Sequence, residues 1–134
     1  MNMVGISQRA FSRLKVGQVV SISRKITQND IDTFTKLSGD TNPIHSSGGK
    51  ETALVHGAFL NALVSAVIGT KLPGPGTIVV QQTLNFPNKC YADESVTVKV
   101  KLADLRKIIT VDFSCEVEEQ NKVVLHGQAK LIHK

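Results

Sequence analysis

The segment HGAFLNALVSAVIGTKLPGPG, residues 56–76, constrains the fold more than any other part of this 134-residue chain. Its large apolar residues cover most of the circumference of a helix, and its polar exceptions, Asn61 and Ser65, are four residues apart and so lie on one side. A helix that is apolar nearly all round is a buried helix. Gly69 and the LPGPG turn end it. The rest of the fold must therefore wrap this helix. The apolar residues are Phe59, Leu60, Leu63, Val64, Val67 and Ile68.

Most of the remaining chain is predicted to form strands, because β-branched residues are frequent in it and apolar and polar residues alternate. The later connections are short, which favours an antiparallel meander. The prediction is an α+β domain with the sheet curled around the apolar helix. One small sheet cannot cover that helix on all sides, so a second copy is expected to complete the cover as a homodimer. The predicted strands are residues 18–26, 77–86, 95–102, 108–117 and 122–132.

A second, shorter helix is expected in the segment QNDIDTFTKLSG, which follows Thr27. Thr27 and Asp30 resemble a capping arrangement, and Gly39 ends the helix. Ile31, Phe34 and Leu37 recur every three residues and predict one apolar face.

Composition is that of one ordinary globular domain, with 41% hydrophobic and 20% charged residues. The net charge of +5 suits anionic partners such as nucleic acid, a phosphate-bearing cofactor or an acidic carrier protein. One tyrosine and no tryptophan argue against stacking on nucleic-acid bases.

Residues 1–15 are basic and lack acids, which fits either a mitochondrial targeting segment or a basic tail. No membrane-spanning segment is expected.

The polar loop LSGDTNPIHSSGGK places two groups that exchange protons, Asp40 and His45, five positions apart. Pro43 restricts Asn42 to an extended conformation and stiffens the loop. A carboxylate and an imidazole that face one small space can share a water molecule and move its proton. The spacing alone nevertheless favours an ordinary turn, in which Asp40 caps the backbone and His45 is solvated.

Gly57 stands where the buried helix begins. The first amides of a helix lack intrahelical partners, and a residue without a side chain lets a ligand oxygen approach them. That geometry suits an oxyanion hole, although a glycine chosen for tight packing fits equally well. His56 adds a third possible metal ligand beside Asp40 and His45, but the spacing matches no common signature, so no metal site is predicted. Cys90 and Cys115 form no disulfide framework.

The stretches FTKLSGDTNPIH, LVHGAFLNALVSAVIGTKLPGPG and VVQQTLNF resemble, in order and spacing, the signature of the MaoC-like (R)-specific enoyl-thioester hydratase family. Residues 18–131 carry the resemblance, and the branch it is most similar to is the mitochondrial 3-hydroxyacyl-thioester dehydratases of type 2 fatty-acid synthesis. The expected division is a basic segment, residues 1–17, and a MaoC-like hotdog domain, residues 18–134.

The resemblance implies a hotdog fold, a homodimer and the reversible dehydration of (R)-3-hydroxyacyl thioesters to trans-2-enoyl thioesters, without a cofactor. It implies that Asp40 and His45 are the catalytic pair and that the Gly57 amide polarises the thioester carbonyl. Asn42, His56 and Ser65 are expected to contribute to substrate binding, with Asn42 holding the loop in shape. The expected partner is an acyl thioester of coenzyme A or acyl carrier protein, with no nucleic acid and no membrane. The expected location is the mitochondrial matrix, with the cytoplasm as the alternative.

One departure and two alternatives remain. The family usually carries an acidic residue two positions after the histidine and a longer segment before VHG, whereas this chain has only SSGGKETAL. The alternatives are a hotdog acyl-thioesterase and a non-catalytic module that binds acyl chains or RNA. Release of free thiol from an acyl thioester would identify the first. Salt-sensitive RNA binding without hydratase activity would favour an RNA-binding form of the second.

Overall fold

The computed structural model describes residues 13–46 and 52–134. Most of the predicted basic segment 1–17, and most of the SSGGK departure after His45, lie outside the described residues. Within the described part, no helix is long and apolar enough to cross a membrane.

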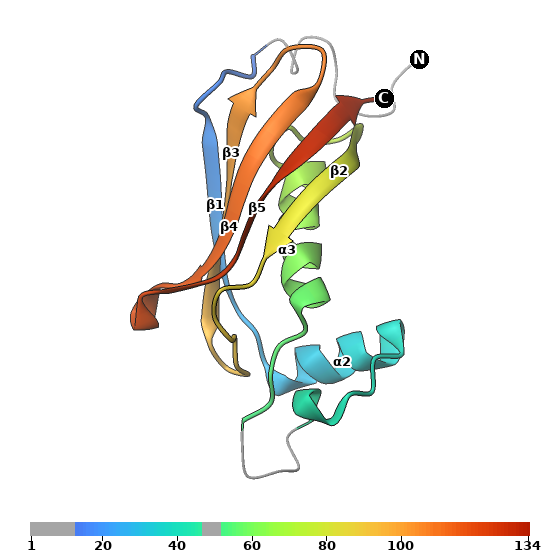
Figure 1. The fold of residues 1–134 in the computed structure, drawn as a ribbon, viewed down its shortest axis with the longest axis vertical. Helices are drawn as coiled ribbons and strands as arrows, with labels where there is room; N and C mark the ends of the chain where they lie inside the picture. Colours follow the sequence, from blue (N-terminus) through green and yellow to red (C-terminus); the bar gives the residue numbers. More distant parts are fainter. Residues whose placement is uncertain (1–12, 47–51) are drawn as a thin grey trace.

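Five antiparallel strands form one sheet in the order β1-β3-β4-β5-β2 (Figure 1). The predicted meander is correct for β3, β4 and β5 but wrong for β2, which pairs with β5 at the far edge instead of with β3. The connection between β2 and β3 therefore joins two strands that are not neighbours in the sheet. The strands are β1 (Val19–Lys25), β2 (Thr77–Asn85), β3 (Ser95–Asp104), β4 (Ile109–Val117) and β5 (Lys122–His133).

Helix α3 (Gly57–Thr70) runs along one face of this sheet and carries the core (Figure 1). One side of it is buried against the strands, through Leu60, Val64 and Val67 among others. The α+β prediction, with one long helix against an antiparallel sheet, is therefore confirmed. Within one chain the opposite side of α3 stays exposed. That side carries Ala58, Ala62, Ser65 and Ala66.

Helix α2 (Gln28–Ser38) lies across the end of α3 (Figure 1). The Thr27–Asp30 capping box is present, and Gly39 ends the helix in the left-handed conformation with φ of 79°. The predicted apolar face is only partly correct, because Ile31 is buried whereas Leu37 is 83% exposed. Each three-residue step turns a helix by about 60° short of a full circle, so two steps carry Leu37 away from the core.

Gly127 in β5 allows β5 to approach β2 closely. A Cβ atom at this position would collide with the backbone carbonyl oxygen of Thr83 and lie 2.9 Å from the ring of Phe113. The β2–β5 pairing, which places β2 at the sheet edge, thus depends on a residue without a side chain.

Candidate active site

Hydrogen bonds within the Asp40–His45 loop shape it, and contacts with Gln28 and Leu54 hold it to the rest of the chain. Pro43, Ile44 and His45 form a short 3₁₀ turn, and the Asn42 side chain caps it by accepting the Ile44 amide at 3.3 Å. Asp40 accepts the Asn42 amide through Oδ1 at 3.2 Å, which leaves its other carboxylate oxygen for other partners. These contacts support the loop-shaping role expected of Asn42, which stays a prediction.

His45 is buried, with 7% of its surface exposed, and its ring orientation is fixed from behind. Its Nδ1 lies 2.7 Å from the backbone carbonyl oxygen of Leu54. A carbonyl oxygen can only accept, so Nδ1 carries the hydrogen and donates it. In the neutral ring Nε2 is therefore the unprotonated nitrogen, and it lies 3.5 Å from Oδ2 of Asp40. His45 is therefore not solvated, as it would be in an ordinary turn.

This arrangement presents two hydrogen-bond acceptors, Asp40 Oδ2 and His45 Nε2, to the same small space. Two acceptors at this distance make no direct hydrogen bond to each other without a proton between them. A water molecule or a hydroxyl group can supply that proton, and a water molecule can donate to both at once. The geometry is thus that of a pair able to orient an oxygen nucleophile and take its proton.

His56 lies against the face of His45. The ring centroids are 3.7 Å apart with 19° between the planes, and only 2% of His56 is exposed. Its Nε2 is 3.1 Å from Oγ1 of Thr35, whereas its buried Nδ1 has no hydrogen-bond partner among the described residues. Burial lowers the pKa of the His56 imidazole, and the charge of His45 acts in the same direction, while Asp40 opposes both. The environment beneath His45 thus favours the neutral form of the His56 ring.

The three groups Asp40, His45 and His56 lie within metal-ligand range, since one ligand atom from each lies within 4.8 Å of the others. The two rings are stacked with their centroids 3.7 Å apart, so their lone pairs lie in two nearly parallel planes. One ion at the zinc–nitrogen distance of about 2.0–2.1 Å from both rings would lie outside the plane of at least one of them, which is poor ligand geometry. As arranged, the cluster fits proton transfer better than metal binding.

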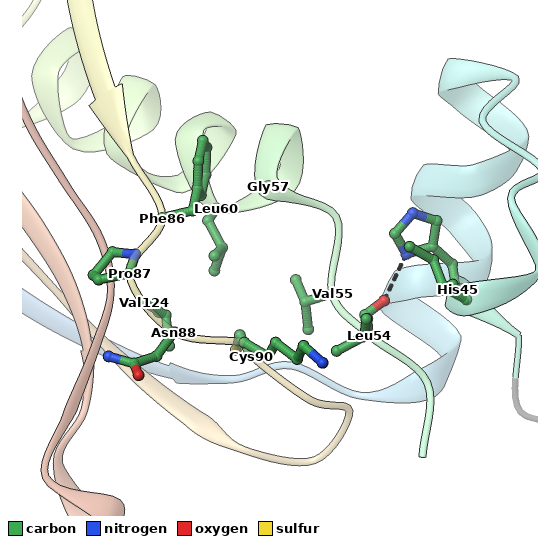
Figure 2. A pocket seen from close by; sticks show the side chains of 12 residues that line it. His45, Leu54, Val55, Gly57, Leu60, Phe86, Pro87, Asn88, Cys90 and Val124 are labelled. Atoms are coloured by element: carbon green, nitrogen blue, oxygen red, sulfur yellow. Dashed lines mark hydrogen bonds between the residues drawn. The ribbon is translucent and has the colours of Figure 1, made fainter. Parts of the chain in front are cut away.

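A cavity of about 550 Å³ opens beside His45, and Asp40 is not among the residues that line it (Figure 2). His45 and Leu54 line it on one side, and Leu60, Phe86 and Val124 line it on the other, with Gly57 at the start of α3 between them (Figure 2). Residues 86–90, the segment that follows β2, all line this cavity. We call this segment the 86–90 wall.

Gly57 begins α3, as predicted, so its N–H is the first amide of the helix. Gly57 also lines the same cavity as His45. The described residues offer no acceptor to the Gly57 N–H. His56 lies behind His45 and is not among the residues that line this cavity, and Ser65 is exposed on the far side of α3. Asn42 lines a smaller neighbouring cavity together with His45.

Sequence reasoning missed the 86–90 wall as a unit. Phe86 was assigned to the end of a strand, and Pro87, Asn88 and Lys89 were given no role. Lys89 lines the cavity and makes no ion pair with the described residues. Arg106, in contrast, is paired with Asp104 at 2.6 Å and lowers the pKa of that carboxyl to about 2. The Phe86–Pro87 pair and the following asparagine are the only local signal of a turn.

Cys90 closes the inner end of the 86–90 wall as a buried thiol. Burial, helped by the nearby carboxylate of Glu94, raises the pKa of Cys90 to about 12. Burial likewise raises the pKa of Cys115 to about 12. Both therefore stay protonated near neutral pH and serve as small apolar side chains.

Comparison with known proteins places this architecture in a family. The family model described as a MaoC like domain matches residues 12–125. A 3-hydroxybutyryl-CoA dehydratase of Methylorubrum extorquens is 37% identical, over 89% of this chain and 80% of the relative. A mitochondrial 3-hydroxyacyl-[acyl-carrier-protein] dehydratase of Arabidopsis thaliana is 28% identical, over 89% of this chain and 77% of the relative. The solved (R)-hydratase of Aeromonas caviae superimposes with a TM-score of 0.83 at 28% identity, over 91% of this chain and 98% of that one.

Proposed function

Because this chain belongs to the MaoC-like domain family, we propose that it catalyses the reversible dehydration of (R)-3-hydroxyacyl thioesters to trans-2-enoyl thioesters. It is a hydro-lyase with the hotdog fold of the (R)-hydratases. The observation that carries the proposal is the His45 ring, held through Nδ1 by the Leu54 carbonyl with Nε2 facing Asp40.

In the hydration direction, a water molecule donates hydrogen bonds to Asp40 and His45 and attacks C3 of the enoyl thioester. The pair takes one proton from this water and returns one to C2, so the proton count balances. In the reverse direction the 3-hydroxyl group occupies the place of the water, and the proton leaves C2. Both directions use the same two acceptors, which suits a reaction near equilibrium.

The carbonyl oxygen gains negative charge while C2 exchanges its proton. We assign the Gly57 N–H to this oxygen, because this amide begins α3, lacks a protein acceptor and lines the same cavity as His45. A preorganised donor of this kind lowers the barrier by on the order of 3 kcal/mol. Asn42 is assigned a supporting role, since its side chain holds the turn that carries His45.

The assignment is tested with Asp40→Asn and His45→Ala, assayed on crotonyl-CoA by the absorbance of the conjugated thioester. Each variant is expected to lose about 10³-fold or more in kcat, because each removes one of the two proton-transfer groups. Asp112→Asn and His126→Ala, both exposed on the sheet, are matched controls and are expected to stay active. Near-native activity in either site variant, with unchanged circular dichroism, would overturn the roles. A thiol dye in the same assay separates hydration from thioester hydrolysis.

The thioester carrier is proposed to enter past the 86–90 wall. Coenzyme A and acyl carrier protein both present the thioester on a phosphopantetheine arm, and the unpaired Lys89 ammonium at this wall suits its phosphate. The named relatives include one protein for each carrier. Comparing kcat/KM for the two carriers in Lys89→Ala and in wild type tests this contact, with a larger KM expected for both.

A homodimer is proposed to cover the exposed edge of the sheet. Successive apolar residues Ile78, Val79 and Val80 point to both faces of β2, and each is more than a third exposed. Such an edge is open to pairing with a second chain, and the exposed small residues of α3 lie beside it. Light scattering on the wild-type protein should give twice the monomer mass. The mass measured for Val80→Lys should be lower, because a charge at the edge strand opposes pairing.

The cellular setting is proposed from the plant relative and the N-terminal composition. A mitochondrial location and a role in type 2 fatty-acid synthesis agree with the name of the Arabidopsis thaliana relative and with the basic residues 1–15. On this proposal residues 1–17 form a targeting segment ahead of the domain 18–134. Fusing residues 1–17 to a fluorescent protein tests this, and cytoplasmic fluorescence would contradict it.

A further inference from the structure

The α-carbon of Gly57 lies against the ring of Phe86. A Cβ atom built on Gly57 would lie 2.8 Å from Cε1 and 3.0 Å from Cζ of Phe86. Carbon atoms that are not bonded to each other normally stay about 3.5–4.0 Å apart, so the present contact is possible only because residue 57 has no side chain. Phe86 lines the cavity beside Gly57, and Figure 2 shows the two at the same end of it.

The same ring borders the space in front of the Gly57 N–H. At a helical φ of about −63°, the Cα–Cβ direction of a residue lies on the same side of its N–Cα bond as its own N–H. Atoms that crowd the Cβ position of Gly57 therefore also flank the approach to its amide hydrogen. That hydrogen has no acceptor among the described residues, so the approach is open apart from the ring.

We propose that Phe86 is a specificity-determining residue, whose ring closes one side of the carbonyl site at the Gly57 N–H. This inference rests on the proposed function, because it assumes that a thioester carbonyl binds there. The ring limits the width available next to the carbonyl carbon. Enoyl thioesters without a branch at C2 fit beside it, whereas a methyl group on C2 competes with the ring for the same space.

The position of Phe86 in the fold supports this role. It follows β2 directly and the residue is 48% exposed, so the position of its ring depends on a limited set of packing contacts that includes Gly57 of α3. A methyl group at position 57 would push the ring away from the helix. A displaced ring either enters the carbonyl site or leaves it open to water, and both outcomes impair the reaction.

The first test is a double-mutant cycle on crotonyl-CoA. Gly57→Ala is expected to lower kcat/KM by on the order of 100-fold, as misplacing groups around a reacting centre does. Phe86→Ala alone should cost less, about 10-fold, and Gly57→Ala/Phe86→Ala should return to within a few-fold of Phe86→Ala. Gly69→Ala is the matched control, because it lies in the same helix and a Cβ there meets nothing within 4 Å. A double variant no better than Gly57→Ala would overturn the proposal.

The second test does not need the Gly57 variant to fold. The kcat/KM ratio of trans-2-methylbut-2-enoyl-CoA to crotonyl-CoA is measured for wild type and Phe86→Ala. The ratio should rise at least about 10-fold in the variant, since one methyl group in a tight site is worth about 10-fold to 200-fold. An unchanged ratio would overturn the proposal.

Failure of the proposed function would look different. In that case wild type would turn over neither thioester, and only the packing of Phe86 against Gly57 could still be measured. Gly57→Ala should then still lower the melting temperature, and Phe86→Ala should remove that loss. Independent effects of the two substitutions on melting would contradict the contact itself.

Discussion

The Asp40–His45 loop and the 86–90 wall form opposite sides of one site by different physical means. The loop is shaped mainly by short-range hydrogen bonds, in which the Ile44 amide donates to the Asn42 side chain and the Asn42 amide donates to Asp40. The wall is held by contacts between residues far apart in the chain. Phe86 packs against Gly57, and the Asn88 side chain donates to the backbone carbonyl of Val123. On the proposed function, proton transfer takes place on the side that is shaped mainly by local hydrogen bonds. The width available to the substrate is set on the side that is built by tertiary contacts.

This difference predicts how each side fails. A locally built loop should lose function residue by residue when its hydrogen bonds are removed. A wall built by packing should respond to pairs of substitutions that restore the fit.

The largest effect should come from removing both proton-transfer groups together. Asp40→Asn/His45→Ala should be no more than a few-fold slower than the slower single variant, because both groups act on the same proton and water molecule. Steady-state kcat on crotonyl-CoA measures this, with His126→Ala as the control for a lost exposed imidazole. Losses that multiply would show that the two groups work independently.

A smaller effect should appear in stability as a function of pH, through His56. Its pKa is lowered in the folded protein, so the unfolded chain binds the extra proton first as pH falls below about 6.5. The free energy of unfolding should therefore decrease on acidification below that pH, with a slope from this group of up to about 1.4 kcal/mol per pH unit.

His56→Phe keeps an aromatic ring against His45 and removes the titration. Urea unfolding at pH 5.0, 6.0 and 7.0 should give a shallower pH dependence for this variant than for wild type. His126→Phe, at an exposed position, is the control for replacing an imidazole by a phenyl ring. Equal slopes for His56→Phe and wild type would mean that His56 titrates normally.

Asn42→Ala should cost about 1 kcal/mol of stability, because it removes the side-chain cap of the 3₁₀ turn. It should also lower kcat while KM changes little, since the turn positions His45. Asn42→Asp keeps the capping oxygen and should recover most of the stability. Thermal melting and steady-state kinetics measure the two effects, and a variant that loses neither would show that Pro43 alone shapes the loop.

The smallest response is expected from the cysteines. Cys90 and Cys115 have pKa values raised to about 12 by burial, so the native protein should react with a thiol dye at pH 8 only slowly. Both should react fully in denaturant. Fast labelling of one thiol in the native state would show that the inner end of the 86–90 wall opens to solvent.

Features fixed by near neighbours were predictable from the sequence. The Thr27–Asp30 cap and the Gly39 terminus were confirmed, since each depends on residues a few positions apart. The buried side of α3 followed from its composition, and the family resemblance identified the loop. Pairing over long distances was not predictable, because the position of β2 beside β5 leaves no periodic pattern in either strand.

The candidate site shows the same limit. Asp40, His45 and Gly57 were predicted together, but the anchor on His45 is the backbone carbonyl of Leu54, which any residue type supplies. The stacking of His56 on His45 depends on how α3 meets the loop, and Phe86 reaches Gly57 across 29 positions of sequence, from 57 to 86. Such contacts are set by the tertiary fold and carry no local signature.

Gly57 and Gly127 show what this means for reading mutational data. In a library with every position randomised and selected for enoyl-thioester turnover, both positions should tolerate almost nothing but glycine. At Gly127 the reason is the Thr83 backbone, which cannot move aside without unpairing two strands. At Gly57 it is a single ring, and a second library built on Phe86→Ala should let alanine through there while still rejecting it at Gly127. Intolerance to substitution in the first library would not distinguish the two positions. Only the Phe86→Ala library separates a position that is needed for the reaction from one that is needed for strand pairing.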